Sequence, residues 1–469
     1  MFVDILHKPK MQTIFRYLVD FASRNPMHGM GYLARTNIHW CEFIYWLAAL
    51  TLMLMFGFDC GLRILNLYQS RNSAITYNVD YMQLNTLYPS LTMCPQQILD
   101  AAKIRNFVSQ FNETSTNEMT EFIKKLSNVN ARRAEYFKMS LDNIPSTNYM
   151  ELIFNLSQIY SVEYNGISAV KVMTDLGICY TIRNFLDKEM NTKNWNDLHH
   201  INQSFINLPH TFNFSNSFPI KMTIKHNIKG KMGIFVHSPY ELPTTWTRAA
   251  VIVSGTQLGT TLVAGIKEMS YQENLMSETS IDERRCHGIT PSSLAMFPTT
   301  YSQNLCLMEC RANYIIEKCQ CIPHFYFNRN LAKFVGVTQV PICNVIGLNC
   351  VHRHAKEIRN LHSNSKSLPM NLTCQCYPNC IGQIIVTEVS NFPLATNNSG
   401  TIILTIEYPP MDSFERSVMY SNLDYAVSLY NVMSAFLGVS ILSLCDLIYF
   451  FTIRVYWFNH GYRGSVNDH

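Results

Sequence analysis

Two long apolar stretches stand out from the mixed pattern of hydrophobic and polar residues along this chain. Residues 43–58 are sixteen consecutive positions without charge, bounded by Glu42 and Asp59. As a helix they span about 24 Å, slightly less than a hydrocarbon core of about 30 Å, and residues 39–41 can extend them. Residues 425–453 are twenty-nine positions with a single charge, at Asp446. Each stretch predicts a membrane-spanning helix, and a buried core helix is the alternative for each.

The acidic residue in the second stretch requires an explanation. A lone aspartate near the centre of a bilayer costs about 2.5–3.5 kcal/mol on insertion scales, so such residues normally face a bundle interior or water. Asp446 therefore predicts that this side of the helix faces either a bundle interior or water.

The region between the two stretches mixes helical and strand-like patterns. Residues 304–319 ("NLCLMECRANYIIEKC") look helical, whereas four apolar runs predict strands at 249–255, 260–266, 383–389 and 400–408. The last run leads through Pro409 and Pro410 toward the second apolar stretch. This strand either transmits force to the membrane helix or merely tethers two domains. The fold class that follows is a membrane protein of the α+β class.

Composition and motifs exclude several function classes. The chain has 469 residues, 47% of them hydrophobic, and a formal net charge of +4 without a basic stripe, so no nucleic-acid partner is expected. The sequence contains no H-E-x-x-H, no G-x-S-x-G and no phosphate-binding glycine loop. We therefore expect no enzymatic activity and no cofactor.

The topology is predicted from the N-terminal tail and the sequons. Residues 1–39 scatter charges and contain no apolar segment typical of a signal peptide, so a cytosolic N-terminus is expected. Two spans then return the C-terminal tail to the cytosol and place residues 61–424 outside. Basic residues flanking the first span are balanced and do not decide its orientation. All six N-x-S/T sequons lie between the spans, on the side where glycans are added: Asn112, Asn155, Asn202, Asn213, Asn371 and Asn397.

The cysteines predict a disulfide framework in the same region. Of fifteen, Cys41, Cys60 and Cys445 lie in or beside the spans, and twelve lie between them. An even number of cysteines in an exported region is typical of disulfides. A zinc site is the alternative, but the spacings here are C-x3-C and C-x-C rather than paired C-x2-C, so no metal is expected.

Cysteine spacing also suggests a ladder. Cys306 and Cys310 share one face of a helix, and Cys374 and Cys376 share one face of an extended strand. An antiparallel arrangement pairs Cys306 with Cys376 and Cys310 with Cys374, although the spacing alone leaves the connectivity open. Each bridge that closes a long loop contributes roughly 3–5 kcal/mol.

Five segments together resemble a known family. They are "SRNPMHGMGYL" before the first span, "LYPSLTMCP" after it, "GICYTI" around Cys179, the cysteine array at 286–380, and "FLGVSILSLCDLIYF" in the second span. The chain resembles a subunit of the degenerin/epithelial sodium channel family, the amiloride-sensitive sodium channels, and is most similar to its pickpocket branch. The resemblance extends over nearly the whole chain.

The resemblance implies a trimer with a hand-like ectodomain of palm, thumb, finger, knuckle and β-ball. It implies a cytosolic tail at 1–39, a first helix at 40–60 and an ectodomain at 61–424, followed by a second helix at 425–453 and a tail at 454–469. Within the ectodomain, 95–285 is the finger, β-ball and palm part, 286–380 the thumb part, with helices near 303–318 and 344–360, and 381–424 the returning palm strands. The implied disulfides are Cys94–Cys179, Cys286–Cys380, Cys306–Cys376, Cys310–Cys374, Cys319–Cys350 and Cys321–Cys343.

The resemblance also assigns a pore to the second span. Gly438, Val439 and Ser440 match the family's G-x-S selectivity filter, where carbonyl groups from three copies would face a partly dehydrated cation. A helix-packing role is the alternative, because Ser434 and Gly438 also form a small-xxx-small pattern. Asp446 would then attract cations as the pore acid, with Ser443 as a pore-lining candidate. On one straight helix Ser440 and Asp446 cannot both point inward, and the family breaks the helix at G-x-S.

Three further positions match gating elements of the family. His28 and Gly29 match the cytosolic His-Gly motif, although a histidine in a glycine-rich turn is usually only a turn. Val427 aligns with the position at which bulky residues hold relatives open.

The resemblance therefore implies a sodium-preferring, amiloride-sensitive cation channel of the plasma membrane with Na+ as its permeant ion. Its expected partners are membrane lipid, two identical or related subunits, and an unidentified extracellular ligand. An ATP-gated trimeric channel is one alternative, but it needs clustered lysines near the outer membrane face, where only Arg63 and Arg416 stand. A membrane-anchored receptor or adhesion protein is another, and it would not explain Asp446.

Overall fold

The computed structural model describes residues 17, 19, 21, 23, 29–35, 38–70, 73–78, 82, 84–110, 113–139, 149–187, 210–254, 258–326, 340–361, 374–393 and 400–456. The chain divides into two compact units. One comprises Met1–Ser73, Ser277–Thr279 and Val418–His469, and the other comprises Ala74–Met276 and Ser280–Ser417.

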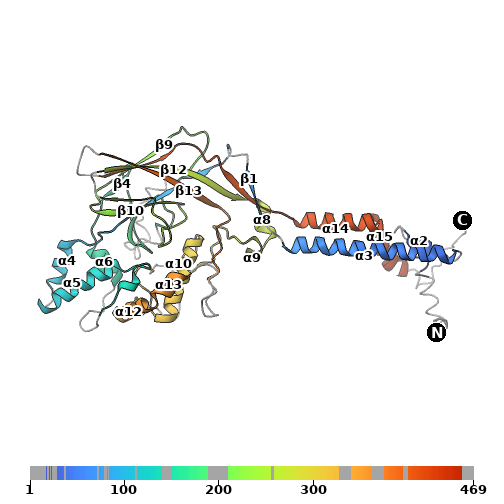
Figure 1. Ribbon diagram of the computed structural model, residues 1–469, viewed down its shortest axis with the longest axis horizontal. Helices are drawn as coiled ribbons and strands as arrows, with labels where there is room; N and C mark the ends of the chain where they lie inside the picture. The colour runs from blue at the N-terminus through green and yellow to red at the C-terminus, as the bar shows by residue number, and fades with distance from the viewer. Residues whose placement is uncertain are drawn as a thin grey trace. The chain divides into compact units, whose positions relative to one another are not determined.

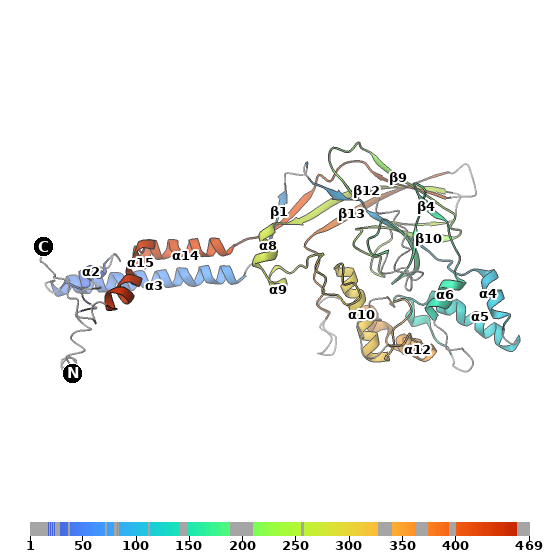
Figure 2. The ribbon, with the colours of Figure 1, turned by 180° about the vertical axis from the view of Figure 1, so that it is seen from behind.

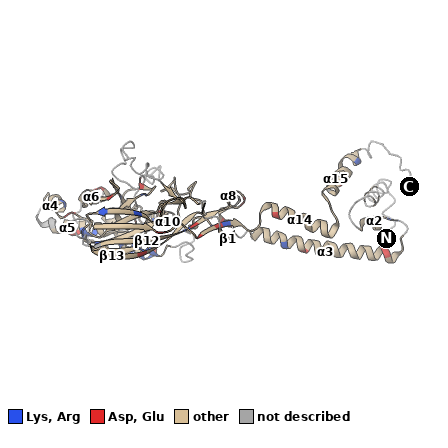
Figure 3. Cartoon of the chain, turned by 90° about the horizontal axis from the view of Figure 1, so that it is seen from above, with Lys and Arg blue, Asp and Glu red and all other residues tan. Residues whose placement is uncertain are grey.

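The first unit contains both apolar stretches as helices. Its elements are α2 (Met30–Leu33), α3 (Trp40–Ser70), α14 (Asn422–Leu437), α15 (Ile441–Tyr449) and the π-helical turn η6 (Phe450–Arg454). α14 lies alongside α3 (Figure 3), with Tyr68 stacked on Tyr425 at a ring-centroid distance of 4.3 Å. The helix expected at 40–60 continues ten residues further, to Ser70.

Only α3, among the described helices, is by itself long and apolar enough to cross a membrane. α14 and the following helix α15–η6 meet this criterion when they are taken together as one span that bends by 82° at residues 438–440. The second stretch is therefore a broken helix rather than a straight one.

The second unit is built around two β-sheets (Figure 1). The larger has the order β1-β15-β12-β14-β9-β4-β5, and β13 pairs with the other edge of β12. β14 and β15 run parallel to the two halves of β12, while β13 runs antiparallel along most of its length. The strands are β1 (Ser73–Asn78), β4 (Val162–Tyr164), β5 (Ile167–Ser168), β9 (Ile220–His226), β12 (Leu258–Tyr271), β13 (Gly382–Pro393), β14 (Gly400–Ile406) and β15 (Ser413–Val418).

The smaller sheet has the order β11-β10-β3-β7-β6, and β2 and β8 form a separate pair. Its strands are β3 (Ser90–Pro95), β6 (Val170–Thr174), β7 (Gly177–Ile182), β10 (Lys231–His237) and β11 (Val251–Ser254), and the pair is β2 (Thr86–Leu87) and β8 (Thr211–Phe212). Apolar side chains of both sheets share one core, which includes Met93, Ile234, Leu262 and Leu404. All four strand-like runs of the sequence are confirmed as β11, β12, β13 and β14.

Helices of the second unit gather in two groups beside the sheets (Figures 1 and 2). The first group is α4 (Ala101–Val108), α5 (Glu113–Asn128), the 3-10 turn η3 (Ala134–Tyr136) and α6 (Tyr149–Leu156); the second is α10 (Gln303–Cys319), α12 (Val345–Arg353) and α13 (Ala355–Asn360). Both groups share a second core that includes Phe122, Tyr149 and Ile315. The short helices α8 (Glu273–Glu278) and α9 (Ile281–Arg284) follow β12.

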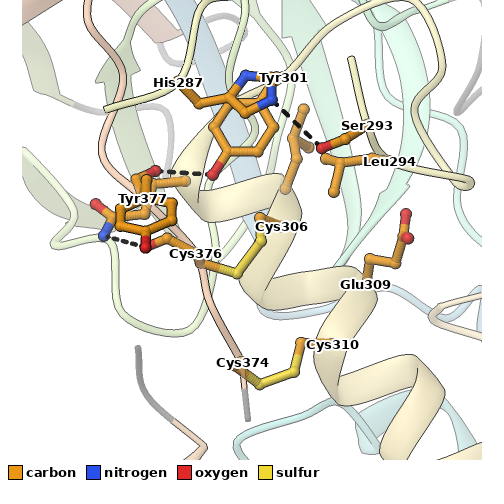
Figure 4. Close-up of a disulfide and its surroundings, with 12 residues drawn as sticks. His287, Ser293, Leu294, Tyr301, Cys306, Glu309, Cys310, Cys374, Cys376 and Tyr377 are labelled. Carbon is orange, nitrogen blue, oxygen red and sulfur yellow. Dashed lines mark hydrogen bonds between the residues drawn. A yellow bond between two sulfur atoms is a disulfide. The ribbon is translucent and has the colours of Figure 1, made fainter. Parts of the chain in front are cut away.

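Six disulfides pair the twelve cysteines in the way that the family resemblance implies: Cys94–Cys179, Cys286–Cys380, Cys306–Cys376, Cys310–Cys374, Cys319–Cys350 and Cys321–Cys343. Figure 4 shows the ladder between α10 and the extended segment at 374–376. Beside it, the ring of His287 stacks on Tyr301 at 3.9 Å, and the Tyr301 hydroxyl donates to the carbonyl oxygen of Tyr377 at 2.8 Å. Covalent and polar contacts thus fix the same end of α10.

Two buried histidines of the sheets remain neutral in the fold. Burial lowers the pKa of His226 and of His237 to about 4 each. Nδ1 of His237 lies 2.9 Å from the carbonyl oxygen of Ser238 and must donate to it, so Nε2 accepts from the Thr92 hydroxyl at 2.8 Å. The ring of His226 covers Gly400, where an added Cβ would come within 2.3 Å of the ring.

Acid is therefore expected to destabilise the second unit. Because the pKa of these histidines is lower in the folded chain than the value of about 6.5 in the unfolded chain, the unfolded chain binds more protons between the two values. The two histidines contribute fully to the free energy of unfolding above pH 6.5. This contribution decreases as the pH drops toward 4, by about 2 kcal/mol per histidine at pH 5. The apparent melting temperature of the detergent-solubilised chain should be lower at pH 5.0 than at pH 7.5. His237→Gln should reduce that difference, whereas His210→Gln, at an exposed position, should leave it unchanged. An equal difference in all three proteins would contradict the assignment.

Candidate ion-conduction and gating site

The helix break is built by three consecutive residues of the second apolar stretch. α14 ends at Leu437, and Gly438 has a left-handed backbone with φ +64°, which favours glycine. The Gly438 N–H donates to the carbonyl oxygen of Ser434 at 3.0 Å, Val439 is buried, and Ser440 is extended. The G-x-S sequence therefore both ends one helix and begins the next.

α15 begins with a reciprocal cap between two serines. The backbone N–H of Ser440 donates to Ser443 Oγ at 3.1 Å, and the backbone N–H of Ser443 donates to Ser440 Oγ at 3.2 Å. The two hydroxyl groups lie 3.0 Å apart. The cap satisfies donors of the new helix, while the helical hydrogen bonds of α14 end with the one from the Gly438 N–H to the Ser434 carbonyl oxygen.

The break positions the predicted pore residues differently from one another. Asp446 is exposed on α15, whereas the Ser443 side chain is only 7% exposed and takes part in the cap. Six residues rotate an ideal helix by about 600°, so on one straight helix Ser440 and Asp446 would point about 120° apart. The bend lies at residues 438–440 and Ser440 is itself extended, so this helical relation does not hold between the two side chains. The Ser440 hydroxyl takes part in the cap with Ser443.

Val427 lies on the side of α14 that faces away from α3. Tyr425 marks the side toward α3 through its stack on Tyr68, and Tyr68 Oη also donates to Asn422 Oδ1 at 2.8 Å. Val427 follows Tyr425 by two residues, so its side chain is rotated by about 200° around the axis of α14. Val427 is accordingly 48% exposed, so a bulkier side chain there would not collide with α3.

The N-terminal end of α14 is capped by two acidic side chains. Asp424 and Ser421 form a capping box, and the backbone N–H of Asn422 donates to Glu278 Oε2 at 3.1 Å. Sequence reasoning missed Glu278, because no local pattern connects it to a helix that begins 144 residues later.

Gly29 occupies the turn before α2. His28 lies outside the described residues. Gly29 has φ +88°, and a Cβ added there would lie 3.2 Å from side-chain atoms of Leu50 on α3. Tyr32 of α2 stacks on Trp46 of α3 at 4.4 Å. The turn therefore requires glycine for its backbone and for its close approach to α3.

Two of the six sequons can be located. Asn155 is exposed on α6, and Asn213 is partly exposed after β8, with its Oδ1 accepting from the backbone N–H of Ser215 at 3.1 Å. Asn112, Asn202, Asn371 and Asn397 lie outside the described residues. Within the described part of the chain, no three His, Cys, Asp or Glu side chains are grouped closely enough to share a metal ion.

Comparisons with known proteins agree on one family. The sequence model described as "Amiloride-sensitive sodium channel" matches residues 21–450. The protein named Sodium channel protein Nach from Drosophila melanogaster is 20% identical over 96% of this chain and 90% of its own length. Pickpocket protein 28 of the same species is 23% identical over 48% of this chain and 38% of its own length. Sodium channel protein Nach of Drosophila ananassae is 19% identical over 96% of this chain and 89% of its own length.

The family match includes α3, both β-sheets, the six disulfides and nearly all of the broken helix that carries Gly438 and Asp446. This chain therefore belongs to the amiloride-sensitive sodium channel family.

Proposed function

We propose that the chain is one subunit of a trimeric, sodium-preferring cation channel of the plasma membrane. The observation that carries the proposal is the break at Gly438–Ser440 within an otherwise apolar segment. Non-helical backbone at membrane depth is tolerated only where protein buries it or where it lines a water-filled cavity. A break of this kind fits a segment that borders a conduction path.

The selectivity filter would be formed by the backbone of three copies. The carbonyl groups freed by the end of α14 would replace part of the hydration shell of Na+ as it passes Gly438, Val439 and Ser440. Asp446, six residues beyond Ser440 and exposed, would face the same path from each subunit and raise the local concentration of cations. Ser443 would support the filter through its cap rather than contact the ion.

The topology that fits this function has two spans, α3 and the bent pair α14–α15, with both tails in the cytosol. The six disulfides and the sequons then lie on the oxidising, glycosylated side. The subunits would be identical or closely related, and an extracellular ligand or a mechanical load would open the pore.

Recording Na+ current from cells that express the chain, with surface protein measured by biotinylation, tests the proposal. We expect a cation current that amiloride blocks. The current should disappear when a large organic cation replaces Na+. The chain should be tested alone and with related subunits. The proposal would be overturned if the chain reached the surface, alone and with related subunits, and no current appeared under acid, peptide or stretch stimuli.

Gly29→Ser is expected to lower the open probability several-fold while the amount of protein at the surface persists. The serine would have to adopt φ +88°, and its Cβ would press against Leu50. Such strain costs on the order of 1–3 kcal/mol and would displace the turn from α3. Single-channel recording with surface biotinylation measures both quantities.

The matched control is Gly31→Ser in the same short helix. Gly31 has an ordinary helical backbone, and a Cβ there would meet only the carbonyl oxygen of Ser23, at 3.9 Å. Its current should resemble that of the unmodified chain. Equal currents from all three proteins at equal surface density would reject a gating role for Gly29.

A further inference from the structure

We propose that one face of α3, marked by Trp46, Leu50 and Gly57, couples the Gly29 turn to the last turn of α14. The proposal rests on the channel function proposed above and assigns Tyr32 and Trp46 as positioning residues for gating. Neither residue would touch the permeant ion.

The inner end of this face holds α2 through an aromatic stack. The rings of Tyr32 and Trp46 lie parallel, with centroids 4.4 Å apart and an interplanar angle of 1°. The guanidinium carbon of Arg35 lies over the Tyr32 ring at 4.8 Å from its centroid. Tyr45 contacts Trp46 edge to face at 5.5 Å. Tyr32 therefore connects a short helix, which has little stability of its own, to the long helix α3.

The next turn of α3 contacts the glycine turn itself. Leu50 follows Trp46 by four residues and so lies on the same helical face. The side chain of Leu50 lies where a Cβ of Gly29 would approach it to 3.2 Å. Trp46 and Leu50 together therefore determine how close the Gly29 turn can lie to α3.

The same face of α3 continues to a contact with Phe436, two positions before Gly438. Gly57 follows Leu50 by seven residues. Because seven residues make nearly two full turns, Gly57 lies on almost the same face of α3 as Leu50. A Cβ on Gly57 would lie 3.5 Å from Cβ of Phe436, so the two helices approach closely here. Phe436 is separated from the helix-ending Gly438 by one residue. A rotation or shift of α3 that accompanies movement of α2 would change this contact directly.

A double-mutant cycle on the full-length chain tests the coupling. Tyr32→Leu removes the stack on Trp46, and Phe436→Leu makes the side chain that contacts α3 at Gly57 smaller. The ratio of open to closed channels is measured for each single variant and for the double variant. A stacked pair is worth about two- to tenfold in such an equilibrium, so Tyr32→Leu should change the ratio by about that factor. If the face couples the two sites, the effects should depart from multiplicativity by about threefold or more.

Two controls separate positioning from folding. Tyr32→Phe retains the ring and should restore the behaviour of the unmodified chain. Tyr430→Leu, at an exposed position about 240° around α14 from Phe436, should combine multiplicatively with Tyr32→Leu. Multiplicative effects for Phe436→Leu as well would overturn the proposal.

A second readout does not require current, so it distinguishes failure of the coupling from failure of the proposed channel function. Cys445 is exposed on α15, and Cys41→Ser with Cys60→Ser leaves it as the only free thiol among the described residues. The rate at which a membrane-permeant maleimide modifies Cys445 should change about threefold or more in Tyr32→Leu and return in Tyr32→Phe, as expected for a coupling free energy of this size. An unchanged rate in Tyr32→Leu would overturn the coupling even if the chain conducts.

Discussion

Asp446→Asn is expected to lower the single-channel Na+ conductance about five- to thirtyfold at low salt. In the proposed trimer, three carboxylates about 6 Å from an ion on the pore axis would contribute about 2 kcal/mol in a water-like dielectric, and the amide would remove this contribution while keeping the side-chain shape. Because salt screens such charges, the loss should shrink as ionic strength rises toward 1 M. Recording conductance against Na+ concentration, with reversal potentials in NaCl gradients for anion exclusion, measures both effects.

Asp59→Asn is the control for Asp446→Asn. Asp59 is an acid on α3 that forms an exposed ion pair with Arg63 at 2.9 Å, and exposed pairs contribute little. The substitution should leave conductance and selectivity unchanged. If Asp446→Asn also left both unchanged, Asp446 would not face the conduction path and the central assignment of the pore would be wrong.

Asp175→Ala is expected to prevent most of the chain from reaching the cell surface. Arg311 on α10 and Asp175, in the turn between β6 and β7, form an ion pair at 3.3 Å with side chains that are 1% and 0% exposed. The Arg311 guanidinium carbon also lies 5.9 Å from the centre of the Trp246 ring. Removing one partner leaves a buried charge without its counter-ion and costs about 3–5 kcal/mol, a large fraction of the stability of a typical domain.

A paired substitution tests whether the cost arises from the orphaned charge. Asp175→Leu combined with Arg311→Met removes both charges and should recover much of the surface expression that either change alone abolishes. Glu121→Ala, which disrupts an exposed ion pair with Lys125, should have no effect. Glycan maturation and the apparent melting temperature of purified protein are suitable measurements. A double variant as defective as the single ones would show that the pair is required for more than charge balance.

Local patterns predicted several elements well. The helical run at 304–319 is α10, and the four strand-like runs are strands, whereas the helix near 344–360, which only the family resemblance implied, is α12 followed by α13. These elements are decided by short-range periodicity, turn residues and caps, which a single sequence displays. The cysteine spacing similarly indicated a ladder, because side chains four apart on a helix and two apart on a strand share a face.

Other features depend on residues that are distant in the sequence. β1 and β15 are neighbours in the larger sheet, where Tyr77 of β1 donates to the carbonyl oxygen of Met411, but neither strand is recognisable locally. α3 continues to Ser70 because an exposed helix tolerates charged side chains such as Asp59 and Arg63, whereas the hydropathy pattern ends at these two residues. Glu278 reaches α14 only because the chain returns to it after β12.

The sequence by itself determined the two apolar stretches, the acid within one of them, the disulfide-forming region and the family resemblance, since all of these are properties of residue type and spacing. Only the tertiary structure decided that the second stretch bends by 82°, that Ser443 caps a helix while Asp446 remains exposed, and that Arg311 is buried against Asp175. The reason is physical: a charged or polar side chain has the same local pattern whether it meets water or a distant partner, and the fold supplies that partner.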